Sequence, residues 1–141
     1  MVYQYFELHL GRDRAAQAAL AKSVYGALGD KAVAVFTPVL GFASDQALVL
    51  IDGEAAADAV LKGAGVVSAQ RQRLTPTIRP KAGAQPMAGG VYVHNWFTID
   101  GAAFDEFVKL SGDAWPDFEA KFDARIFGLF ERASPANVPG T

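Results

Sequence analysis

The chain has 141 residues, 13 basic and 15 acidic side chains, and no cysteine. This length suits one compact domain, or one domain and part of another, and it suffices for a hydrophobic core without disulfides or a structural metal. The missing cysteines exclude a thiolate nucleophile, a cysteine-based zinc site and a disulfide framework, and the net charge of -2 provides no basic field for nucleic acid.

The N-terminal segment MVYQYFELHL has no basic stretch followed by an apolar one, so it does not resemble a secretion signal. No apolar run reaches the ~18 residues that a membrane-spanning helix needs. We therefore expect a cytoplasmic protein that binds neither membranes nor nucleic acid.

Residues 1–80 alternate strand patterns with helix patterns. Residues 2–10 have the period of two that is typical of a strand, and Gln4 is the one polar residue on the predicted core face. A helix is expected after Asp13 as N-cap, and Gly29 should end it. Its apolar positions recur every fourth residue: Ala16, Leu20, Val24 and Leu28.

Two further strands are predicted at residues 31–39 and 46–51, followed by a helix over 53–62 with Asp52 as its N-cap. Residues 71–79 form a weaker strand pattern, because a proline within it favours an edge position. The resulting order β-α-β-β-α-β predicts a ferredoxin-like α+β unit over residues 1–80, with both helices on one face of an antiparallel sheet.

Residues 81–90 are rich in glycine and proline and are predicted to be a linker. Beyond it, residues 91–99 align with residues 2–10 and predict a strand. Asp100 should cap a third helix, which Pro116 should kink or split, and residues 125–131 should form another strand. Residues 91–133 thus form a partial second repeat, β-α-β, followed by a tail at 134–141.

An incomplete repeat leaves sheet edges and the apolar stripe of the third helix without partners within the chain. Two explanations stay open. Either the chain is a truncated piece of a longer tandem protein, or a second chain completes it, and the second explanation makes a homodimer the expected partner.

Packing motifs are spread over nearly the whole chain, and the segments that carry them are Tyr5-Phe6-Glu7-Leu8, Gly41-Phe42, 46–51, 92–97, 105–111, 114–119 and 128–130. Together they resemble the NIPSNAP-like branch of the dimeric α+β barrel superfamily. The resemblance implies a dimeric α+β barrel fold. The superfamily includes cofactor-free monooxygenases, haem-degrading enzymes, isomerases and sensing modules, so the fold alone does not choose a function.

If helices cover one face of the sheet, the other face lines the barrel. Strand alternation assigns seven candidate ligand-binding residues to that face: Tyr3, Tyr5, Glu7, His9, Tyr92, His94 and Trp96. Aromatic walls with a few polar groups suit a pocket for a small apolar or aromatic molecule. The same residues also suit a filled barrel or an oligomer interface, so a non-catalytic interaction module remains the alternative.

Catalysis is left open, and no catalytic residue is assigned. His94, or His9 beside Glu7, could serve as a general base in a cofactor-independent, monooxygenase-like enzyme. No metal site and no cofactor are expected, because two histidines alone do not form a ligand set. The basic residues Arg71, Arg73, Arg79 and Lys81 and the acidic residues of the third helix are predicted to be solvated.

Overall fold

The computed structural model describes residues 1–13 and 15–133, and the predicted tail at 134–141 lies outside the described residues. The chain divides into two compact units, Met1–Leu74 and Thr75–Thr141. None of the helices in the described residues is long and apolar enough to cross a membrane.

The first unit is built on four strands: β1 (Tyr3–Leu10), β2 (Ala32–Phe36), β3 (Gln46–Asp52) and β4 (Val66–Pro76). β1 pairs antiparallel with both β3 and β4, and β2 pairs antiparallel with β3. The full strand order is β2-β3-β1-β4-β5. The protein is therefore an α+β protein with an antiparallel sheet, and its element order is compatible with the predicted ferredoxin-like fold.

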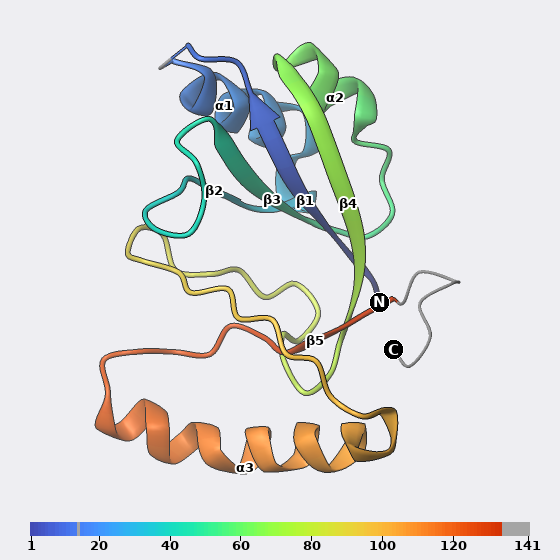
Figure 1. The fold of residues 1–141 in the computed structure, drawn as a ribbon, viewed down its shortest axis with the longest axis vertical. Coiled ribbons are helices and arrows are strands. Elements are labelled where there is room, and N and C mark those ends of the chain that lie inside the picture. Colours follow the sequence, from blue (N-terminus) through green and yellow to red (C-terminus); the bar gives the residue numbers. More distant parts are fainter. Residues whose placement is uncertain (14, 134–141) are drawn as a thin grey trace. The chain divides into compact units, whose positions relative to one another are not determined.

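Helices α1 (Ala16–Leu28) and α2 (Asp58–Gly63) lie on the same face of this sheet (Figure 1). The predicted C-terminal end of α1 is confirmed, since Gly29 ends the helix with φ of 53°. The predicted N-cap is wrong: Ala15 takes that position and provides no side-chain cap, while the Asp13 carboxylate accepts the Ala15 backbone N–H at 2.9 Å ahead of the helix. The core on this face combines strand and helix side chains, namely Phe6, Leu8, Leu10, Leu20, Val24, Ala32, Ala47, Val49, Ile51, Ala57 and Leu61.

The predicted start of the second helix is wrong, because α2 begins at Asp58 and Asp52 is the last residue of β3. The buried side chain of Gln4 explains the difference. Its amide group donates hydrogen bonds to the carbonyls of Gly53 and Ala55, both at 2.9 Å, and thereby holds the intervening chain as a loop. Gly53 also has φ of 86°, a left-handed conformation that an α-helix cannot include.

β4 begins at Val66, earlier than the sequence predicts, and Pro76 is its last residue. The segment 66–70, VVSAQ, is mostly exposed and begins with two successive valines, so it lacks a clear alternation of apolar and polar residues. The segment is a strand because it pairs with β1, in a register that runs from Tyr3 opposite Leu74 to Leu10 opposite Val66.

The second unit contains the long helix α3 (Phe104–Lys121) and the short strand β5 (Phe130–Arg132). The Asp100 carboxylate accepts the Ala102 backbone N–H at 3.0 Å and so caps the 3₁₀ turn Gly101–Ala103, which leads into α3. The N-cap of α3 itself is Ala103, which provides no side-chain cap, so the predicted cap lies one turn ahead of the α-helix. Pro116 lies inside α3 without splitting it. The strand expected at 125–131 is reduced to β5, which follows two backbone hydrogen bonds between Leu129 and residues Thr77 and Arg79.

The prediction of a strand at residues 91–99 is wrong, because this segment is neither helix nor strand. Its alternation survives only in part: Val91 and Val93 are exposed, whereas Tyr92 and His94 are half-buried. A period of two assigns side chains to alternate sides of an extended chain, but it does not provide a neighbouring strand.

Candidate functional site

Four of the candidate residues share one face of β1, the face opposite the helices. Along this face burial decreases in chain order: Tyr3 is 0% exposed and Tyr5 5%, Glu7 is half-buried, and His9 is exposed. The face therefore has an apolar, buried end and a polar, accessible end.

Neighbouring strands extend the apolar end of this face. Tyr5 lies directly opposite Leu50 of β3, and Tyr3 lies opposite Leu74 of β4; both leucines are buried. Leu48, also buried, lies opposite Glu7. Residues directly opposite each other on antiparallel strands point to the same side of the sheet. Because α1 and α2 cover the other side, the sheet is apolar on that side and also at one end of this face.

Burial keeps the two tyrosine hydroxyls on this face protonated. It raises the pKa of Tyr3, with a smaller contribution from the negative charge of Asp52. It also raises the pKa of Tyr5, and the nearby Glu7 carboxylate adds to that effect. Both phenols are therefore neutral hydrogen-bonding groups at physiological pH, which suits ligand orientation rather than proton abstraction.

His9 lies at the accessible end of the face and contacts the neighbouring strand. Its Nε2 atom is 3.3 Å from Nε2 of Gln46, its partner in the β1–β3 register. The Gln46 side chain is itself oriented, since its Oε1 atom accepts the Ala43 backbone N–H at 2.6 Å. This contact holds the imidazole against the neighbouring strand β3.

The other three candidates, Tyr92, His94 and Trp96, lie in the irregular segment of the second unit. The Tyr92 hydroxyl donates a hydrogen bond to the Met87 carbonyl. The Arg132 guanidinium lies 5.9 Å from the centre of the Trp96 ring, and this ring is 48% exposed. Trp96 therefore contacts a residue 36 positions further along the chain, in β5.

Burial lowers the pKa of His94 below its ordinary value of 6.5, so the folded protein holds this imidazole neutral at pH 7. As the pH falls below 6.5, the unfolded chain binds the proton first, so the free energy of unfolding should decrease. We expect His94→Gln to flatten this pH dependence in urea denaturation between pH 7 and pH 5. An NMR titration of a His9→Gln chain, with His94 as its one imidazole, should give a pKa below 6.5; a higher value would contradict the assignment.

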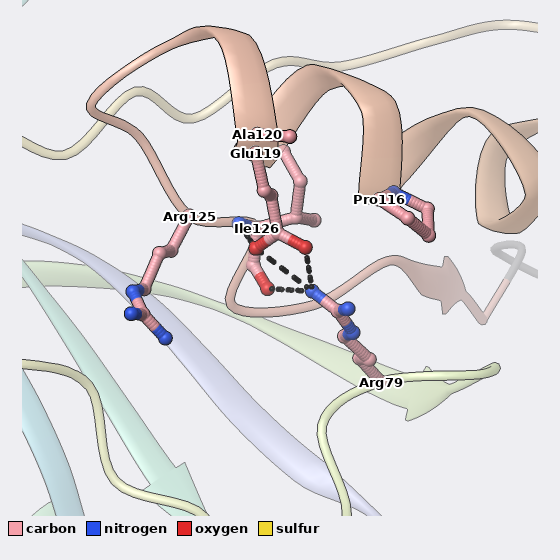
Figure 2. A pocket seen from close by; sticks show the side chains of 6 residues that line it. All are labelled: Arg79, Pro116, Glu119, Ala120, Arg125 and Ile126. Atoms are coloured by element: carbon pink, nitrogen blue, oxygen red, sulfur yellow. Dashed lines mark hydrogen bonds and ion pairs between the residues drawn. The ribbon is translucent and has the colours of Figure 1, made fainter.

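A pocket of about 500 Å³ lies in the second unit at the C-terminal end of α3 (Figure 2). It is lined by Arg79, Pro116, Glu119, Ala120, Arg125 and Ile126. Arg79 donates hydrogen bonds to both carboxylate oxygens of Glu119, at 3.0 and 3.1 Å, and to the Ile126 carbonyl at 3.1 Å. These bonds connect α3 to the loop that follows it.

The Arg79–Glu119 pair favours the charged form of the glutamate. The hydrogen bond from Arg79 lowers the pKa of Glu119, and desolvation acts in the opposite direction. The Ile126 backbone N–H and the charges of Arg79 and Arg125 lower this pKa further. On its other side, the Arg79 guanidinium lies 5.0 Å from the centre of the Trp115 ring, a cation–π contact with a buried aromatic residue.

The expectation that Arg79 and Glu119 are simply solvated is wrong. Their side chains are 34% and 21% exposed, respectively, and they form an ion pair. Sequence patterns offered no signal for this pair, because its members are 40 residues apart and each lies among other charged residues. The pocket was missed for the same reason.

In the part of the chain that the structure describes, no three histidine or acidic side chains are grouped closely enough to hold a metal ion. No family model, curated protein or solved structure matches the chain. We therefore infer function from the geometry within each unit.

Proposed function

We propose that this chain is a ferredoxin-like binding protein, similar to the NIPSNAP-like branch of the dimeric α+β barrel superfamily. It holds a small apolar or aromatic molecule at the sheet face opposite α1 and α2. The observation that carries this proposal is the gradient along β1, from the buried Tyr3 and Tyr5 to the half-buried Glu7 and the exposed His9.

Small-molecule sites combine an apolar wall with a few polar groups that fix orientation. In this site Tyr5 and the buried Leu48 and Leu50 supply the wall. Glu7 and His9 supply the polar groups at the accessible end. The phenol of Tyr5 is protonated and therefore adds no charge to this wall.

Self-association is the second candidate function, and the edge of the sheet favours it. β2 (Ala32–Phe36) is the outermost strand on one side, and its sequence AVAVF contains no charge or proline that would discourage pairing with another strand. A second copy of the chain could add to this edge and form the homodimer that the family resemblance implies.

Thermal denaturation in the presence of 2-naphthol, an uncharged aromatic probe, tests the first candidate. We expect a saturable rise in the melting temperature, because the probe binds only the folded state. Tyr5→Phe should weaken this response, whereas Tyr25→Phe, the same change on an exposed side chain of α1, should not. A flat response of the unaltered protein, or equal responses of the two variants, would contradict the site.

Light scattering at micromolar concentration separates the two candidates. A dimer that Val35→Lys in β2 converts to a monomer would support association through this edge. A monomer at all concentrations tested would rule out the second candidate and leave the first unaffected.

A further inference from the structure

The pocket at the C-terminal end of α3 contains Arg125, which interacts with the Glu119 carboxylate through its charge but forms no hydrogen bond or ion pair with a described residue. Arg125 lines the pocket and is exposed. In Figure 2 its guanidinium lies on the opposite side of the Glu119 carboxylate from that of Arg79.

Glu119 is already occupied by other donors. Its Oε1 atom accepts from Arg79 at 3.0 Å, and its Oε2 atom accepts from Arg79 at 3.1 Å and from the Ile126 backbone N–H at 3.2 Å. Two arginines and one glutamate leave the pocket with a formal charge of +1. One further anion would therefore complete the charge balance.

We propose that this pocket binds a small organic carboxylate, with the Arg125 guanidinium as its anchor. Guanidinium groups bind carboxylates through two parallel hydrogen bonds, which gives both affinity and orientation. The carbon chains of Pro116, Ala120 and Ile126 provide contacts for the body of the ligand. The volume, about 500 Å³, is in the range of small-molecule sites.

The charge balance favours a carboxylate over phosphate. A monovalent carboxylate brings the pocket to neutrality, whereas a doubly charged phosphate would make it negative beside the Glu119 carboxylate. The surrounding groups are already held in place: Arg79 lies between Trp115 and Glu119, and Glu119 fixes the loop through Ile126. A site that is ordered before binding loses less conformational entropy when the ligand enters.

Titration of the full chain with sodium benzoate, followed by NMR of the backbone amides, tests this proposal. Saturable shifts should be centred on Ile126 and Ala120. Arg125→Gln should weaken binding by about tenfold or more, the usual cost of losing a charge-assisted hydrogen-bonded pair. Arg12→Gln removes the same charge from an exposed position of the first unit and should leave the affinity within about twofold.

Three results would contradict the proposed carboxylate site. Absence of saturable shifts, or an equal loss in the two arginine variants, would overturn the proposal. Inorganic phosphate binding as tightly as benzoate would overturn the assignment of a carboxylate. 2-Naphthol carries no carboxylate, and Tyr5 lies in the other unit. A negative result with 2-naphthol would therefore leave the α3 pocket untouched, and a negative result with benzoate would leave the β1 site untouched.

Discussion

Replacing Phe6 with alanine should lower the free energy of unfolding by about 3–5 kcal/mol. Phe6 is 1% exposed, lies in the middle of β1 and packs into the core that the strands share with α1 and α2. Truncation would remove a buried ring and leave a cavity that the neighbouring strands cannot fill completely. Urea denaturation followed by far-ultraviolet circular dichroism measures the change.

Val67→Ala is the matched control for this truncation, since Val67 lies on β4 but is 74% exposed. Its effect should stay within about 0.5 kcal/mol. A cost of Phe6→Ala that is as small as that of the control would mean that the helix-covered face does not form the core.

Replacing the adjacent Tyr5 with alanine should cost about 3 kcal/mol, although its side chain points to the opposite face. A sheet covered on one side only would tolerate truncation on its other side. Here Tyr5 is 5% exposed and lies opposite the buried Leu50, so truncation would remove a buried ring from this face as well. The same denaturation experiment measures this variant beside Phe6→Ala.

Tyr5→Phe separates the ring from the hydroxyl. It keeps the buried ring and removes one hydroxyl, so its cost should be about 1 kcal/mol. If Tyr5→Ala were as mild as Tyr5→Phe, the second face would not be a packed surface, and the wall of the proposed ligand site would be lost with it.

The two proposed sites differ in how they recognise a ligand. The β1 face offers neutral phenols and leucines, so the proposal for it expects ligands with a large apolar area. The α3 pocket offers an exposed guanidinium beside the Arg79–Glu119 ion pair, so the proposal for it expects anionic ligands. Uncharged and anionic probes therefore report on them separately.

Local patterns correctly predicted the elements that are specified by residues within them or next to them. Strand β1 was predicted from the alternation of its residues. Helix α1 was predicted from apolar residues at every fourth position and from Gly29, which directly follows it. Asp100 likewise acts on a backbone N–H two residues away. The assignment of Tyr3 and Tyr5 to one face of β1 needed nothing beyond the period of a strand.

At three places local sequence patterns led to a wrong or missing prediction, because contacts between distant residues decide the structure there. The start of α2 was wrong because Gln4 holds a loop about 50 residues along the chain. The strand at 91–99 was wrong because alternation alone supplies no partner strand. The α3 pocket was missed because Arg79 and Glu119 are paired across 40 residues.

The sequence by itself determined that this is an α+β protein, where its first strand and two of its helices lie, and which side chains share the faces of β1. Those features follow from periodicity and from capping residues, which act over a few positions. Only the tertiary structure decided how deeply each tyrosine is buried, where α2 begins and that Arg79, Glu119 and Arg125 line one pocket. Burial and ion pairing depend on which distant segments pack together, and no local pattern carries that information.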